Sequence, residues 1–265
     1  MEIDHDILKW LIDNFQVFVL VLTRIAGFFF LMPVFSSKTL PVQIKAATVL
    51  VLSLVFTPIV PFTANQLPSS PINFILLGVA EIFLGMTTAL FLRLIFAGLQ
   101  TAGQMVGVQM GLSVANIMDP QTGVQSVVVA QFAYLIALLF FLAWDGHHVL
   151  LILLNKSFNL VAPGKLELSM PLYDMVMVMG QEMFILSVTI MAPVITILLF
   201  SQVALGILAK MVPQINMLIV SFGLNVGLGL IFIGITLQVF WPIFSGHLEH
   251  AASLMPQAMS LMGGN

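Results

Sequence analysis

Two charged residues lie inside long apolar runs of this sequence and are the first candidates for chemistry. Arg24 lies in the first apolar run, and Glu81 lies in a later one. Charges in apolar surroundings are costly, and they are usually paired or face a polar interior. The main interpretation is a structural ion pair between Arg24 and Glu81. A place in a polar conduit and a proton-coupling site are the alternatives, and a single Glu without further acids nearby is a poor proton relay.

A second group of candidates is the run Asp145-Gly146-His147-His148, whose side chains are able to ligate metals. Adjacent histidines point in different directions on a helix, and zinc sites need three or four converging ligands. We therefore interpret this run as a polar helix break or interfacial turn. We interpret the C-terminal run from His247 to His250 in the same way, and we expect no metal site and no cofactor.

Known motifs for energy use and catalysis are missing from the sequence. It contains no GxxxxGK[ST] loop to hold phosphates, no G-x-S-x-G elbow, no H-E-x-x-H pair and no dinucleotide fingerprint. With no cysteine, thiolate metal sites and cysteine nucleophiles are excluded. The net charge of -3 gives no argument for nucleic-acid binding. We expect that the protein is not an enzyme.

The most informative segment spans residues 98–125, which contain five glycines, five glutamines and a single charge, Asp119. Two interpretations are open. The first is a pair of tightly packed helix ends joined by the turn Met118-Asp119-Pro120, with Asp119 capping the second helix. The second is a re-entrant hairpin or loop that enters a water-filled cavity, the only setting in which non-helical backbone is tolerated at membrane depth. The residues alone do not decide between them.

Small and flexible side chains recur within this segment. Four small residues at intervals of four would form a smooth helix stripe that another backbone can approach closely. Met105, Met110 and Met118 also fall here, and Met packs adaptably against irregular neighbours. These three are either ordinary packing residues or flexible side chains that close a gap and yield to something passing through. The stripe consists of Gly103, Gly107, Gly111 and Ala115.

The composition places these residues in an all-α membrane protein. Hydrophobic residues make up 60% of the 265 residues and charged residues only 7%, whereas soluble chains average about 25% charged residues. A spanning helix needs about 20 mainly apolar residues. The last apolar segment carries Gly223 and Gly227, which favour close helix packing. Six hydrophobic segments meet the criterion, at roughly 10–33, 45–62, 72–97, 127–152, 183–209 and 213–243.

Charges divide the chain into two parts. The segment 153–182 holds the densest charge, including Lys165, Glu167 and Asp174. We therefore predict an N-terminal part at residues 1–160, a linker at 161–182 and a C-terminal hairpin with its tail at 183–265.

Several motifs together resemble the FliR family of flagellar export-gate proteins, which have counterparts in virulence-type type III secretion systems. The central motif is Gly103-Gln104-Met105-Val106-Gly107-Val108-Gln109-Met110-Gly111, followed by Ala115, Asp119-Pro120 and Gly123. Further matches are Thr23-Arg24-Ile25-Ala26-Gly27 before Pro33, then Pro41, Glu81 with Gly85, and Val212-Pro213-Gln214-Ile215-Asn216. The similarity covers about residues 10–245.

The resemblance implies a specific function. FliR-like proteins assemble with FliP-like and FliQ-like subunits, and with an FlhB-like subunit alongside, in the bacterial inner membrane at the flagellar basal body. Residues 1–160 would be FliP-like and residues 183–265 FliQ-like. Unfolded flagellar subunits would pass through the pore, which a loop at about 105–123 would plug when the gate is closed. The plug residues implied are Met105, Gly107, Gln109, Met110, Gly111, Met118, Asp119 and Pro120.

Alternative functions are compatible with the same sequence. A virulence-type secretion gate would share most of these motifs. A secondary transporter or solute channel would favour inverted repeats and ion-coordinating acids near the midplane, and only Glu81 is available. An anchoring subunit of a membrane enzyme usually needs haem-ligating histidines within its spans, and none of the five histidines lies mid-span. Because FliR-like hairpins need not cross the bilayer straight, the six segments are a hydropathy count and not a number of crossings.

Overall fold

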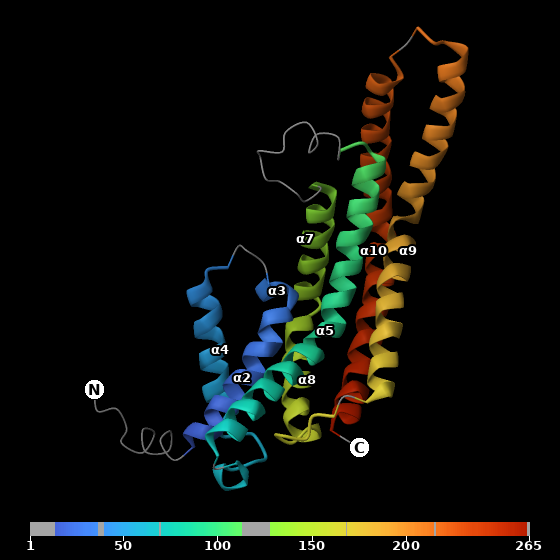
Figure 1. Cartoon of the computed structure of the whole chain (residues 1–265). Coiled ribbons are helices and arrows are strands. Elements are labelled where there is room, and N and C mark those ends of the chain that lie inside the picture. The colour runs from blue at the N-terminus through green and yellow to red at the C-terminus, as the bar shows by residue number, and fades with distance from the viewer. Residues whose placement is uncertain are drawn as a thin grey trace. The chain divides into compact units, whose positions relative to one another are not determined.

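The protein is helical throughout the part of the chain that the structure describes. This computed structural model describes residues 14–36, 40–68, 70–112, 128–167, 169–214 and 216–263, and no residue among them forms a strand. The predicted all-α class is therefore confirmed. The helices in chain order (Figure 1) are α2 (Phe15–Leu31), α3 (Pro33–Ser36), α4 (Val42–Phe56), the 3-10 turn η1 (Ala64–Gln66), α5 (Pro71–Gln109), α7 (Val128–Ala143), α8 (Gly146–Leu160), α9 (Met170–Met211) and α10 (Met217–Met262).

Three of the described helices are long and apolar enough to cross a membrane, namely α5, α9 and α10 from Ile219 onward. The broken pair α7 and α8 makes a fourth candidate if it counts as one span. The remaining two of the six predicted segments form α2 and α4, of 17 and 15 residues. At about 1.5 Å per residue, both are shorter than the ~30 Å hydrocarbon core of a bilayer.

The chain forms two compact units, and each consists of several separate stretches of sequence. Unit 1 contains Met1–Arg93, Asp145–Met179 and His250–Asn265, and unit 2 contains Leu94–Trp144 and Gly180–Glu249. These units do not follow the sequential division into residues 1–160 and 183–265. That division rests on the density of charge in residues 153–182 and stays a prediction.

Glycines allow α2 and α5 to pack closely in unit 1. A Cβ built on Gly27 would lie 3.0 Å from the Cα of Ile82, and one built on Gly85 would lie 2.7 Å from the nitrogen of Phe28. Because neither glycine has a side chain, the two backbones come into direct contact. The same face of α2 buries Leu20, a fully enclosed side chain, so this contact belongs to the core of the unit.

In unit 2, α5 contributes a stripe of buried side chains and the aromatic ring of Phe96 to the core. The stripe runs along the helix at intervals of three and four residues, which is the period of an α-helix face. The ring of Phe96 makes edge contacts with Phe141 of α7 and Phe244 of α10, with centroids 5.7 and 5.8 Å apart. The buried stripe consists of Ile95, Leu99, Ala102, Val106 and Met110.

The unit-2 parts of α9 and α10 form an antiparallel hairpin (Figure 1). The Ser201 hydroxyl donates to the Asn225 side-chain oxygen at 2.8 Å near the turn. Far from the turn, His247 Nδ1 lies 3.1 Å from Glu182 Oε2. Both pairs join α9 to α10 across the hairpin, so the predicted C-terminal hairpin exists within this unit.

Two predicted boundaries are wrong. Residues 170–182, predicted as linker, form the start of α9, because Leu172 and Met179 bury one face of a helix there. The last segment, predicted to end near residue 243, continues to Met262. Leu248, Met255 and other buried residues follow a helical period along this extension, which overrides its polar residues.

Candidate functional site

The C-terminal end of α5 is closed by its own backbone. Gly111 has φ +84°, a left-handed conformation that glycine adopts without strain. The N–H of Leu112 donates to the carbonyl of Gly107 at 3.0 Å, and the N–H of Gly111 donates to the carbonyl of Val108 at 3.0 Å. This pattern is a Schellman motif, which satisfies carbonyls that a helix end otherwise leaves open. The helix therefore ends at a defined position within the glycine-rich and glutamine-rich segment 98–125.

Met110 holds this helix end against α10. Its side chain is fully buried. A Cβ built on Gly229 of α10 would lie 2.7 Å from the Met110 sulfur and 2.7 Å from its terminal methyl carbon. The missing side chain at Gly229 thus provides the space that Met110 fills. Next to it, a Cβ on Gly111 would lie 3.4 Å from the Phe222 ring, so the turn itself also contacts α10.

Other glycines of α5 pack against α7 and α9 of the same unit. A Cβ on Gly103 would lie 2.8 Å from the backbone nitrogen of Ala130, so α7 contacts the α5 backbone there. The Ser187 hydroxyl of α9 donates to the carbonyl of Gly98 at 2.7 Å and also reaches the carbonyl of Met183. The first residue of the predicted stripe, Gly103, therefore lies at a close backbone approach.

The structure changes where the predicted plug segment begins. Met105, Gly107 and Gln109 belong to the last turns of α5, so the predicted loop cannot start at residue 105. The helix persists here despite its glycines because Val106 and its stripe neighbours are buried. Three of the remaining plug residues, Met118, Asp119 and Pro120, lie outside the described residues, as does Ala115 of the stripe.

The exposed side of this helix end is weakly polar. Met105 is 39% exposed, and Gln104 is exposed beside it. Gln109 is half-buried, and its side-chain oxygen has no hydrogen-bond partner among the described residues. Gly107 is buried. The end of α5 thus offers uncharged amide and thioether groups next to the segment that comes after it.

Two glycines predicted to pack helices face open space within the described part of the chain. A Cβ built on Gly223 or on Gly227 would find no atom within 4 Å. A packing role at these positions therefore needs another chain, and it stays a prediction.

Arg24 and Glu81 form a fully enclosed ion pair in unit 1. Their side chains are 0% and 1% exposed, and Arg24 Nε donates to Glu81 Oε2. The other two guanidinium nitrogens donate to the carbonyls of Ser157 at 2.8 Å and Val161 at 3.0 Å. The Arg24 guanidinium also lies 4.5 Å from the centroid of the Phe158 ring.

This arrangement gives Arg24 a structural task. Ser157 lies in the last turn of α8, and Val161 is its C-terminal cap. A cation at the carbonyl end of a helix is favoured by the helix dipole and satisfies open acceptors. Arg24 therefore ties α2 to α5 through Glu81 and to the end of α8 through two carbonyls. Glu81 Oε1 has no partner among the described residues.

The run at Asp145 breaks a helix, as the sequence predicted. Asp145 has φ +58° and separates α7 from α8. Its carboxylate lies 3.3 Å from His148 Nδ1, and both side chains are exposed. Ligand atoms of Asp145, His147 and His148 lie within 4.8 Å of one another. The two imidazole rings are tilted by 37° to each other, with centroids 4.1 Å apart. A tetrahedral zinc site needs three or four converging ligands, and the absence of a metal here stays a prediction.

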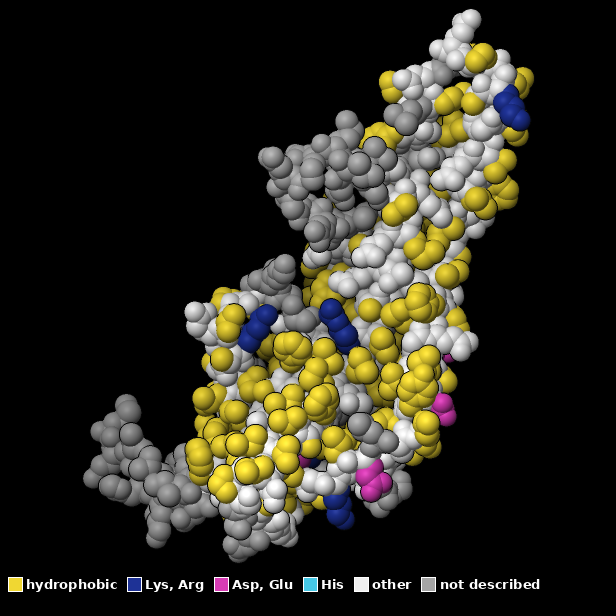
Figure 2. Space-filling model, in the orientation of Figure 1, with side chains coloured by type: hydrophobic (Ala, Val, Ile, Leu, Met, Phe, Trp, Pro, Cys, Tyr) yellow, Lys and Arg dark blue, Asp and Glu magenta, His cyan; other side chains and the backbone are white. Residues whose placement is uncertain are grey.

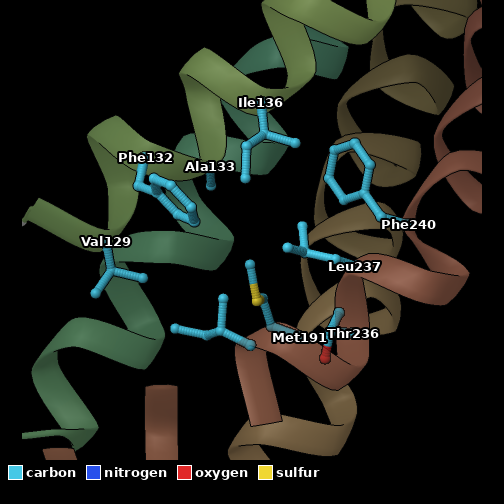
Figure 3. Close-up of a pocket in the computed structure, with 9 residues that line it drawn as sticks. Val129, Phe132, Ala133, Ile136, Met191, Thr236, Leu237 and Phe240 are labelled. Carbon is cyan, nitrogen blue, oxygen red and sulfur yellow. The ribbon is translucent and has the colours of Figure 1, made fainter. Parts of the chain in front are cut away.

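The small cavity of unit 2 is not a ligand site. Figure 3 shows side chains of α7, Met191 of α9 and side chains of α10 around it. Its volume of about 20 Å³ is room for roughly one water. The one hydroxyl in the lining, that of Thr236, donates to the Phe232 carbonyl within its own helix. The cavity is a gap in apolar packing.

Comparison with known proteins identifies the family. The family "Bacterial export proteins, family 1" matches residues 15–251. The chain belongs to this family. Three similar proteins are the flagellar biosynthetic proteins FliR of Bacillus subtilis (strain 168), Pectobacterium carotovorum subsp. carotovorum and Escherichia coli (strain K12). They are 30%, 30% and 28% identical over 96%, 92% and 91% of this chain and 98%, 90% and 90% of their own.

Membership in this family also indicates where the protein is located. This family 1 export protein is a FliR-type flagellar export protein of the bacterial inner membrane, with several apolar helices in the described part of the chain. The resemblance drawn from the motifs is therefore confirmed.

Sequence reasoning missed several packing and hydrogen-bond contacts of this family 1 export protein. Gly229, whose missing side chain leaves room for Met110, is not among the glycines of the last segment that the sequence singled out. Gly27 and Gly85 were noted only as motif residues, although both lie at direct backbone contacts. The two carbonyls that accept from Arg24 leave no mark in the sequence, because every residue carries one.

Proposed function

We propose that this chain is the FliR-like subunit of the flagellar protein export gate, and that the segment beginning with the α5 cap closes the channel. Residues 110–123 take this role in place of the wider 105–123, because residues up to Gln109 are helical. Unfolded flagellar subunits are the substrates. The chain acts as a transport component, and the proposal gives it no catalytic role.

One observation carries the proposal: the segment leaves a helix end that is fixed in place. The Schellman cap fixes Gly111, and Met110 packs into the space left by Gly229 of α10. These contacts hold the first two residues of the segment in unit 2. A closing element needs such an anchor, since a freely fraying helix end would not return to one position. The uncharged glutamines and methionines near it suit a closure that binds no one substrate strongly.

Exposed apolar side chains support assembly with other subunits. Phe184, Phe200 and Ile219 are 61%, 65% and 68% exposed, and much of such a surface meets lipid or other chains. Gly223 and Gly227 on α10 are open for close approach by another helix. FliP-like, FliQ-like and FlhB-like subunits are the proposed partners, with the α9–α10 hairpin as the FliQ-like element.

The flagellar version of the gate is favoured over the virulence-type version. The three relatives named above are all flagellar biosynthetic proteins. A secondary transporter is disfavoured, because Glu81, the acid that such a transporter would use to coordinate an ion, is engaged by Arg24.

Replacing residues 113–123 with a serine-glycine sequence of equal length tests the closing role. This change starts after Leu112 and so keeps the cap and the buried Val106 and Met110. The expected result is an assembled complex with increased ion conductance in planar bilayers. A matched control replaces the α9–α10 turn, residues 212–216, which also joins two helices. An assembled complex with unchanged conductance would refute the closing role.

Purification in mild detergent tests the partners separately. The expected result is co-purification of the three proposed subunit types when all are expressed together. A stable homodimer that transports a small solute would contradict the gate and favour the transporter alternative.

A further inference from the structure

A large apolar groove with a cationic end opens on unit 1. Its volume is about 920 Å³, within the range of sites that enclose ligands of several hundred daltons. Side chains of α2, α3 and α4 supply most of the lining, and Phe30 and Leu50 are 70% and 48% exposed there. The charged members of the lining are Lys45 and Arg93, and no acid is among them.

Both cations lie at the same end of the groove. Gly85 contacts the backbone at Phe28, and Arg93 follows Gly85 by about two helix turns, so Arg93 lies beyond the C-terminal half of α2. Lys45 lies in the first turn of α4, just after the connection from α3. The opposite end is formed by residues such as Leu22 that carry no charge. Figure 2 shows two Lys or Arg side chains at one edge of a broad hydrophobic surface over this part of the molecule.

This pattern matches an amphiphile with a negative head. An apolar trough suits acyl chains, because each buried methylene contributes about 0.8 kcal/mol. Two cations at one end attract a phosphate, and basic pockets between membrane helices bind lipid head groups in this way. A zwitterionic head group would bring its own cation close to Lys45 and Arg93 and lose part of that attraction.

We propose that this groove binds one anionic diacyl phospholipid, with its phosphate between Lys45 and Arg93 and its acyl chains along α2 and α4. Lipid is favoured over a protein segment because the lining combines an open apolar trough with positive charge at one end and no acid. This proposal is independent of the closing role of residues 110–123.

Native mass spectrometry of the full-length chain tests the proposal, with phosphatidylglycerol and phosphatidylcholine of the same acyl chains as probes. We expect phosphatidylglycerol to bind more tightly than phosphatidylcholine. The double variant Lys45→Gln/Arg93→Gln should weaken phosphatidylglycerol roughly thirty-fold, at about tenfold per 1.4 kcal/mol and about 1 kcal/mol per cation, and leave phosphatidylcholine nearly unchanged. The matched control, Lys156→Gln/Lys210→Gln, removes two exposed cations outside the groove and should change binding less than threefold.

A groove-filling variant keeps the proposal testable if the charge variant is poorly folded. Ala46→Phe adds apolar bulk at an exposed lining position and leaves both cations in place, so it should reduce binding of both lipids. Equal affinity for the two lipids, or an equal loss in the control variant, would overturn the proposal. Unchanged binding in Ala46→Phe would also overturn it, and so would loss of the lipid once partner subunits are co-expressed, because a protein would then be the occupant.

Discussion

Among single side-chain substitutions in unit 1, Arg24→Met should be the most destabilising. The change removes the donor to Glu81 and the donors to the carbonyls of Ser157 and Val161. Methionine keeps the apolar stem but supplies no charge and no hydrogen bond. Glu81, which is 1% exposed, is then left buried without its partner, and the end of α8 loses its cap.

The magnitude follows from these contacts. Breaking a buried ion pair by removing one partner costs about 3–5 kcal/mol, because an uncompensated charge remains. Glu81→Gln should cost about 1–3 kcal/mol, since Arg24 keeps both carbonyl acceptors and an amide oxygen can still accept. The double variant Arg24→Met/Glu81→Leu removes both charges and should recover most of the loss, because apolar pairs of similar volume often replace buried ion pairs without cost.

The assay is thermal unfolding of the detergent-purified full-length chain, together with its yield in membranes. Ser157→Ala is the matched control: it removes a hydroxyl that donates to Leu154 but keeps the backbone carbonyl that accepts from Arg24. We expect the order of stability to be wild type and Ser157→Ala first, then Glu81→Gln, then Arg24→Met. If Arg24→Met is as stable as Glu81→Gln, or if the double variant is less stable than Arg24→Met, the reasoning is refuted.

Three further predictions concern glycines, each measured on the purified chain. Gly229→Ala places a methyl 2.7 Å from the Met110 sulfur and should lower the free energy of unfolding by about 1–3 kcal/mol through overpacking. The control Gly227→Ala faces open space and should be neutral or stabilising. An equal loss of stability in both variants would contradict the packing of Met110 against Gly229. Gly103→Val should separate α5 from the backbone it contacts and lower the unfolding temperature more than either of these, and an unchanged temperature would disprove the close approach. Gly111→Ala should cost about 1–2 kcal/mol because of its φ of +84°, and hydrogen exchange at the end of α5 should then rise; unaltered exchange would argue against the cap.

The helices, the Arg24–Glu81 pair and the helix break at Asp145 were predictable from the sequence. The apolar runs around Arg24 and Glu81 indicated helices, and the cost of intramembrane charge indicated that the two residues would meet. The polar run at Asp145 indicated a helix break because its side chains interrupt an apolar segment. In each case a strong local pattern and one physical rule lead to the same answer.

Tertiary burial decided the features that the sequence left open or got wrong. Glycine disfavours helix by about 1 kcal/mol relative to alanine, and the glycine-rich stretch before Gln109 was therefore a poor helix on propensity alone. Burial of Val106 and Met110 outweighs that cost. Similarly, the charges near Asp174 suggested a linker, yet burial of Leu172 and Met179 on one face continues α9 through it.

Because the end of α5 is capped by its own backbone, the position after Leu112 is a suitable site for inserting foreign sequence. Because the amides of Gly111 and Leu112 close the helix through carbonyls of the same turn, its termination does not depend on which residues come after Leu112. Sequence beyond that position is therefore free to vary in length and chemistry while α5 keeps its register. The same independence lets an engineer graft a reporter peptide or a crosslinkable residue after Leu112 without unwinding the helix that carries it.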